Sequence, residues 1–339
     1  MNRSEYPDFT RRRFLSASAA LGASSLLGFP RIGAAEPPPE TTKIRFLDDP
    51  SICLAPQYLA MELLRQEGFT QVEGVSPQPE LGLDVVAAGR ADFVMWDVPG
   101  LLPSLDAGKR IVVLAGVHAG CWELFGSHRV QAIRDLKGKR VAVSALGSSE
   151  HIYVASMLAY VGMNPKRHIN WVEAGTVPDS MRLFVEGKVD AFLGFPPQPQ
   201  DLRARKIGHV IVDTTQDRPW SQYFCCTITA NRDFVRKYPI ATKRVVRAIL
   251  KAADICAQEP ERVARFMVDK GYEPRHETAL EVMKMVPYRR WREANPEDTL
   301  RFYALRLHEV GMIKTSPNRL IAQGTDWRFL NELKKELKA

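Results

Sequence analysis

Short apolar runs alternate with helix-like segments along the first part of the chain. The spacing predicts strands at 43–47, 71–75, 92–96 and 110–115, separated by helices at 55–67 (stopped by Gly68), at a segment ending at Gly89 and at 98–107. Such alternation is typical of βα units built around a largely parallel sheet. The chain is therefore predicted to begin its fold as an α/β layer.

A second series of the same kind follows. It has predicted strands at 140–143, 169–172, 189–194 and 209–213, and a helix over about 149–160. The two series share a local pattern, because Gly89-Arg90-Ala91-Asp92-Phe93 has a counterpart in Gly187-Lys188-Val189-Asp190-Ala191. In each, a helix ends at a glycine that can adopt the left-handed conformation, and an acidic residue introduces a buried strand. We therefore expect two similar lobes.

From about Arg232 the pattern becomes helical, and a β-rich run at 223–229 precedes it. This run is placed to return the chain to the first lobe, so the chain crosses between lobes near 116–125 and near 222–230. Two strand-like crossings make a hinge, and a ligand would lie in the cleft opposite it. The predicted domains are lobe 1 at 43–118 and 222–339, and lobe 2 at 119–221.

The N-terminal segment has the features of an export signal. Arg11-Arg12-Arg13-Phe14-Leu15 precedes a weakly apolar stretch and the small residues Ala34-Ala35, which predicts a Tat-type signal at 1–35 with cleavage near Ala35. The alternative, a basic surface helix, is disfavoured by Gly22, Gly28 and Pro30. The apolar run is shorter than the roughly 20 residues that span a bilayer. We expect a periplasmic protein, with a proline-stiffened linker at 36–42.

Composition and charge narrow the class of protein. At 339 residues with 45% hydrophobic and 25% charged positions, the chain suits a soluble two-lobed protein. Its net charge of +8 comes from 47 basic and 39 acidic residues, and these fall to 42 and 37, a net +5, without residues 1–35. The remaining basic residues are interspersed with acidic ones and form no groove with stacking aromatics, so nucleic-acid binding is not expected.

Several motifs together resemble a known family. They are Ala55-Pro56-Gln57-Tyr58-Leu59-Ala60, Gly89-Arg90-Ala91-Asp92-Phe93, Asp135-Leu136-Lys137-Gly138-Lys139-Arg140-Val141-Ala142-Val143, Gly187-Lys188-Val189-Asp190-Ala191 and Ala230-Asn231-Arg232-Asp233-Phe234 with Pro239. In this order they resemble the solute-binding proteins of ABC importers, in the nitrate/sulfonate/taurine group that also contains thiamine-pyrimidine and riboflavin binders. The resemblance covers residues 43–339.

The resemblance implies a periplasmic-binding-protein type II fold: α/β, with two βα lobes joined by a two-strand hinge and a helical C-terminal region. It also implies a monomer without catalytic activity or cofactor that binds a small organic molecule, such as an aromatic or heterocyclic acid, a sulfonate or a pyrimidine-like compound. The expected partners are an ABC permease and its ATPase, and membrane contact is expected only through the permease.

Candidate ligand-binding residues follow from the rule that ligands meet the carboxyl ends of strands in open α/β sheets. This rule and the crossings select Cys53, Trp96, Asp97, Ser148, Ser149, His151, Glu173, Phe195 and Tyr223. Aromatic side chains at strand ends can stack a flat ligand, although each one taken alone more often belongs to the core. His151 can titrate near neutral pH and contact an anion, or serve as a surface or capping residue.

Two alternatives stay open at the predicted helix starts. Ser148 and Ser149 open a helix, where exposed N–H groups can bind an anion or the serine can simply cap. Asp97 precedes Val98-Pro99 and is predicted either to cap a helix or to face the cleft. In the cleft, Asp97 would repel an oxoanion and accept a hydrogen bond from an amine or ring N–H, and Glu173 would act similarly.

Catalytic and metal motifs are weak. The chain has no GxSxG, HExxH, Walker loop or GxGxxG. His118 and Cys121 have a metal-like spacing but lack a second pair, and Cys225-Cys226 suits a buried strand better than redox chemistry. The five cysteines, with no CxxC, form neither a disulfide scaffold nor a zinc ribbon.

Two other functions are kept as alternatives. One is an enzyme on the same fold, similar to the yeast-type thiamine-pyrimidine synthase, although Cys225-Cys226-Thr227 does not match the CCCFC iron-site motif of that family. The other is a periplasmic sensor or partner protein.

Overall fold

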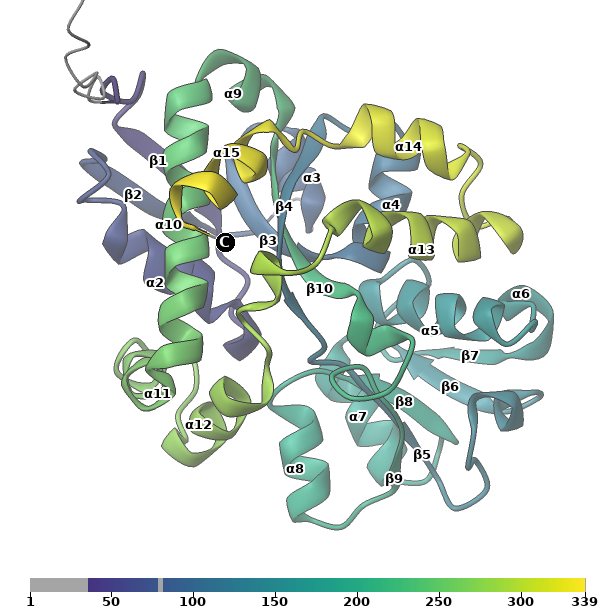
Figure 1. Cartoon of the computed structure of the whole chain (residues 1–339). Coiled ribbons are helices and arrows are strands. Elements are labelled where there is room, and N and C mark those ends of the chain that lie inside the picture. The colour runs from purple at the N-terminus through teal and green to yellow at the C-terminus, as the bar shows by residue number, and fades with distance from the viewer. Residues whose placement is uncertain (1–35, 79–81, 339) are drawn as a thin grey trace, which may run out of the picture. The chain divides into compact units, whose positions relative to one another are not determined.

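The computed structural model describes residues 36–78 and 82–338. The predicted signal peptide and its cleavage site therefore lie outside the described residues. The described residues from Pro39 onward form one compact unit that contains two five-stranded sheets (Figure 1). Among the described helices, none combines the length and apolar character that crossing a membrane requires.

The first sheet contains the strands of the first predicted series. Its order is β2-β1-β3-β10-β4, built from β1 (Lys43–Leu47), β2 (Gln71–Val75), β3 (Phe93–Asp97), β4 (Ile111–Ala119) and β10 (Phe224–Asn231). Strand β1 pairs in parallel with β2 and β3, whereas β10 is antiparallel to β3 and β4. The connecting helices are α2 (Ala55–Leu63), α3 (Leu83–Ala87) and α4 (Val98–Asp106), with the short 3-10 helix η1 (Ile52–Leu54) before α2.

The second sheet repeats this arrangement. Its order is β7-β6-β8-β5-β9, built from β5 (Glu123–Gly126), β6 (Arg140–Val143), β7 (Asn170–Glu173), β8 (Ala191–Gly194) and β9 (His209–Asp213). Its helices are α5 (Ser149–Tyr160), α6 (Pro165–His168), α7 (Val177–Val185) and α8 (Gln198–Ala204), with η2 (Ile133–Leu136) before β6. In both sheets the fourth position is an antiparallel strand. We call the first sheet with its helices lobe 1 and the second lobe 2.

Two crossings connect the lobes and are bonded to each other. The chain leaves lobe 1 after β4 and returns as β10 after η3 (Trp220–Gln222). The Trp122 amide donates to Thr214 Oγ1 at 3.0 Å, and the Thr214 amide donates to the Trp122 carbonyl at 3.0 Å. A Cβ at Gly120 would lie 2.7 Å from the Thr215 Cα, so only glycine permits this approach. The lobe boundaries predicted above stay a prediction.

The helical pattern after Arg232 forms seven helices within the described residues. They are α9 (Arg232–Lys237), α10 (Pro239–Gln258), α11 (Pro260–Asp269), α12 (His276–Met285), α13 (Pro296–Glu309), α14 (Pro317–Gly324) and α15 (Arg328–Glu336), with η4 (Arg290–Arg292) before α13. Four of them begin at proline, whose missing N–H costs nothing in a first turn. The Glu40 carboxylate accepts the Ile240 and Ala241 amides at 2.9 Å each, so the end of the predicted linker caps the start of α10.

Some element boundaries differ from those predicted. The helix expected over 55–67 ends at Leu63, because the chain turns over the next residues to reach Gly68 in the left-handed region. Strand β4 continues to Ala119, four residues beyond its predicted end, and is buried throughout. The separate strand β5 was not predicted, because four residues beside a crossing show no periodicity.

Candidate functional site

A cavity of about 560 Å³ lies where the strand ends of both lobes converge. Its wall includes segments after β1, β3, β6 and β8, the crossing residue Trp122, and Cys226 near the start of β10. A larger hollow of about 1010 Å³ is lined by α4, β4, α9, α14 and neighbouring residues, with none from lobe 2. We take the smaller cavity as the candidate site, because ligands in open α/β sheets lie beyond the carboxyl ends of the strands.

The structure brings most of the predicted site residues to this cavity. The lining includes Cys53, Trp96, Asp97, Ser148, Ser149 and Phe195. Three predicted residues, His151, Glu173 and Tyr223, are not part of the lining.

Those three residues have other partners. His151 is buried, accepts the Gly147 amide at Nδ1 (2.9 Å) and packs edge-on against Trp171, and burial lowers the pKa of its imidazole. Glu173 accepts the Leu146 amide at 2.9 Å. Both side chains therefore accept hydrogen bonds from the loop before α5. Tyr223 stacks on Phe302 with ring centroids 4.1 Å apart.

Asp97 both caps a helix and lines the cavity. Its Oδ1 accepts the Gly100 amide at 2.7 Å, which caps α4, and its Oδ2 accepts the Ser149 hydroxyl at 2.5 Å. The second bond joins the end of β3 in lobe 1 to the first turn of α5 in lobe 2. The side chain is only 7% exposed, and this burial raises the pKa of Asp97 to about 7 although both hydrogen bonds oppose the shift.

Gly100 makes this junction possible. A Cβ at this position would overlap Ser149 Oγ and would lie 2.8 Å from Asp97 Oδ1. The absence of a side chain at residue 100 therefore leaves room for the hydrogen bond between Ser149 and Asp97. Sequence reasoning did not select Gly100, although a glycine in the first turn of a helix was a signal for a close approach.

The charged groups at the cavity are mostly acidic. Among the residues that line it, Asp49, Asp97 and Glu150 are acidic and Lys109 is basic. Lys109 Nζ pairs with Asp84 at 2.5 Å, and Glu150 accepts the Ser144 amide at 2.6 Å. A simple anion would thus meet carboxyl groups beside a lysine that is already paired, whereas an N–H donor would find acceptors.

Aromatic rings form part of the wall. Trp122 packs edge-on against Phe195 with centroids 4.8 Å apart, and it also contacts Tyr153 at 5.7 Å. Trp96 is half-buried at the end of β3. The combination of flat apolar surfaces with a few fixed polar groups is what small-molecule sites usually contain.

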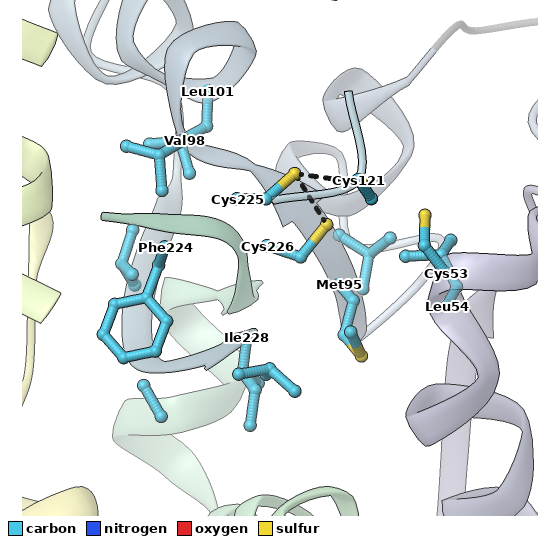
Figure 2. Packing of buried hydrophobic residues seen from close by; sticks show 14 of the residues in the cluster. Cys53, Leu54, Met95, Val98, Leu101, Cys121, Phe224, Cys225, Cys226 and Ile228 are labelled. Atoms are coloured by element: carbon cyan, nitrogen blue, oxygen red, sulfur yellow. Dashed lines mark hydrogen bonds between the residues drawn. The ribbon is translucent and has the colours of Figure 1, made fainter. Parts of the chain in front are cut away.

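Cysteines lie where the cavity meets the core of lobe 1. Cys53 and Cys226 belong to the cavity lining, and Cys121 and Cys225 are buried close to them. The Cys225 Sγ is 3.4 Å from that of Cys121 and 3.8 Å from that of Cys226 (Figure 2). All five cysteines are free thiols in this structure.

Comparison with known proteins identifies the family. Residues 65–263 match the family described as NMT1/THI5 like. The chain belongs to the NMT1/THI5-like family. A curated relative of this NMT1/THI5-like chain is the Saccharomyces cerevisiae 4-amino-5-hydroxymethyl-2-methylpyrimidine phosphate synthase THI12, at 22% identity over 240 residues, covering 65% of this chain and 68% of the relative.

Solved structures show the fold of this NMT1/THI5-like protein. The periplasmic nitrate-binding protein NrtA from Synechocystis PCC 6803 has a TM-score of 0.72 at 16% identity, covering 89% of this chain and 90% of its own. The periplasmic aliphatic sulphonate binding protein SsuA from Escherichia coli has a TM-score of 0.65 at 18% identity, covering 84% and 91%. The predicted periplasmic-binding-protein type II fold is confirmed.

Proposed function

We propose that this protein is the solute-binding component of an ABC importer. It is exported, captures a small organic molecule between its two lobes and delivers it to a permease with an ATPase partner. The observation that carries the proposal is the cavity at the converging strand ends, which is lined from both lobes by aromatic rings and fixed polar groups. The likeness to binding proteins of nitrate and sulfonate importers supports the same role.

The chemistry of the cavity favours a flat ligand with an N–H donor. Trp96, Trp122 and Phe195 offer ring surfaces, and the Asp97 carboxyl offers acceptors at the junction of the lobes. An oxoanion as small as nitrate would leave the rings unused and would lie beside acidic groups. A pyrimidine-like heterocycle therefore fits the cavity better than nitrate or an aliphatic sulfonate.

A thermal-shift screen tests this proposal. The chain without residues 1–35 is incubated with pyrimidines, other heterocycles, aromatic acids, aliphatic sulfonates and nitrate. A ligand at 100 times its Kd adds about 2.7 kcal/mol, which raises the Tm by several degrees. We expect a shift from heterocyclic bases and none from nitrate. A shift from nitrate or sulfonates alone would contradict the assigned ligand class, and no shift from any compound would contradict the binding role.

Variants locate the binding site for any compound that shifts the Tm. Trp96→Ala should abolish the shift while the protein stays folded, because it removes a ring from the cavity wall. Trp327→Ala is the matched control, since Trp327 is also half-buried but does not line the cavity. Equal shifts in the two variants would show that the ligand binds elsewhere.

The yeast relatives favour a second candidate, an enzyme of pyrimidine synthesis. The same screen separates the two, because a binding protein returns its ligand unchanged. Mass spectrometry of each stabilising compound after prolonged incubation distinguishes them, and conversion of a compound would favour the enzyme.

A further inference from the structure

Five buried side chains form a cluster behind the cavity wall, which we call the Cys/His cluster: Cys53, His118, Cys121, Cys225 and Cys226. They come from four places in the chain, namely η1, the end of β4, the first crossing and the start of β10. Each is at most 5% exposed. Strand pairing brings two of them together directly, because His118 is the register partner of Cys226.

The spacing of the donor atoms matches a metal site. Ligand atoms of Cys53, His118 and Cys226 all lie within 4.8 Å of one another, and so do those of His118, Cys121 and Cys225. Sulfurs bound to one tetrahedral ion at about 2.3 Å are about 3.8 Å apart. The Sγ–Sγ separations of 3.4 Å between Cys121 and Cys225 and 3.8 Å between Cys225 and Cys226 lie close to that value (Figure 2). A disulfide would need about 2.05 Å.

His118 supplies an independent sign that the cluster binds something. Its side chain is fully buried, and its Nδ1 lies 3.2 Å from the Ala119 carbonyl. Donation from Nδ1–H to this carbonyl leaves Nε2 as a bare lone pair, the form in which histidine ligates metals. Nε2 has no hydrogen-bond partner within the described residues. An unpaired buried acceptor is costly unless it is occupied.

We propose that the Cys/His cluster binds one thiophilic d10 metal ion, of the Zn²⁺ or Cu⁺ kind. Thiolates and imidazole together are the donors that such ions prefer, and no carboxylate belongs to the set. His118 is common to both groups of three donors, so it ligates the ion whichever cysteines complete the shell. Each thiol that becomes a ligand releases one proton, so the positive charge of the ion is offset by thiolates.

The ion reaches the cluster through the cleft. Cys53 and Cys226 line the 560 Å³ cavity, whereas Cys121, Cys225 and His118 lie behind them. Once bound, the ion links the first crossing to strand β10, which follows the second crossing. Cys121 is its ligand in the first crossing, and Cys225 is its ligand in β10. The metal site is therefore distinct from the aromatic wall of the ligand site, although both open into one cavity.

Metal titration of the reduced protein tests the proposal. The chain without residues 1–35 is purified without oxygen, stripped with a chelator and titrated with Zn²⁺ and with Cu⁺ against chromophoric competitors. Co²⁺ serves as a spectroscopic probe, because thiolate ligation gives an intense near-ultraviolet band. We expect one ion per chain and a higher Tm in its presence. The relative affinities of Zn²⁺ and Cu⁺ then identify which ion the site prefers.

Matched variants locate the ion. Cys225→Ser and His118→Gln should weaken binding by at least the roughly 10- to 100-fold that loss of an outer-shell partner causes. Cys256→Ser is the control, because Cys256 is also a fully buried free thiol but lies on α10, outside the cluster. If Cys225→Ser fails to fold, Cys53→Ser at the edge of the cavity replaces it.

Three results would overturn the proposal. The first is the absence of binding by the folded, reduced protein. The second is equal binding by the cluster variants and by Cys256→Ser. The third is a Cys121–Cys225 disulfide, found by mass spectrometry of unreduced peptides from freshly isolated protein. None of these results bears on whether an organic ligand raises the Tm, so the metal titration and the ligand screen fail independently.

Discussion

Replacing Asp97 with asparagine should change how the stability of the protein depends on pH. Burial raises the pKa of this carboxyl to about 7 in the folded state, whereas the pKa of an unfolded aspartate is about 3.9. The folded protein therefore binds an extra proton between these values. The stabilisation that this proton on Asp97 gives the folded state is complete below about pH 3.9 and is lost as the pH rises through 7.

The magnitude follows from the two pKa values. A pKa difference of 1 between the folded and unfolded states corresponds to about 1.36 kcal/mol. Between pH 5 and pH 8 the unfolded carboxyl is ionised throughout, whereas the folded carboxyl keeps its proton up to about pH 7. The free energy of unfolding that this carboxyl contributes therefore falls by about 2.5 kcal/mol between pH 5 and pH 8. Asparagine cannot ionise, yet its side-chain oxygen can still accept the Gly100 amide, as a good N-cap. Relative to the wild type, Asp97→Asn should therefore gain about 2.5 kcal/mol across this pH range.

Urea titrations at pH 5, 6, 7 and 8 measure this difference. The free energy of unfolding of Asp97→Asn should rise steadily against that of the wild type, with most of the gain between pH 5 and 7. Asp179→Asn is the control, because Asp179 is bonded to Thr176 and Arg182, which lower its pKa, so it stays ionised over the whole range. The reasoning is refuted if the difference in the free energy of unfolding between the wild type and Asp97→Asn stays constant with pH.

Two further changes test the packing around the cleft. Gly100→Ala should destabilise the protein by about 1–3 kcal/mol in thermal melts, because its Cβ would meet Ser149 Oγ. Gly74→Ala is the control and should cost clearly less, because its Cβ would have contacts no closer than 3.4 Å. Equal losses of stability in the two variants would contradict the close approach at Gly100. Tyr153→Phe should cost about 1–3 kcal/mol, because the buried Tyr303 hydroxyl loses its partner at 2.9 Å. The double variant with Tyr303→Phe should recover part of that loss, and strictly additive effects in urea titrations would show that the hydroxyls do not interact.

The regular elements of the fold were largely predictable because local chemistry determines them. Helix α5 has the predicted bounds, since Ser148 caps its start and Gly162 follows its end in the left-handed region. Strand β9 also has its predicted bounds, and the family resemblance is confirmed by the match over residues 65–263. Strand β5 was missed because its four residues gain their strand pairing from β8 and β9, which lie far along the chain.

The candidate site was less predictable, because its geometry depends on tertiary contacts. The strand-end rule brought Asp97 and Ser149 to one cavity, but nothing local indicated that they share a hydrogen bond. The cysteines show the same limit. His118 and Cys121 have a metal-like spacing but lack a second pair nearby in the sequence, and Cys225 and Cys226 join them only when β10 pairs with β4.

The place of β10 in its sheet imposes an order on folding during synthesis. Lobe 2 receives its antiparallel strand β5 before its other strands, so it is complete once β9 leaves the ribosome. Lobe 1 must wait, because β10 lies between β3 and β4 but is made after all of lobe 2. Until then β3 and β4 have unpaired edges, which are prone to pair with other chains. The lobe that begins first is thus finished last, and a partly made chain lacks both the ligand cavity and the complete Cys/His cluster.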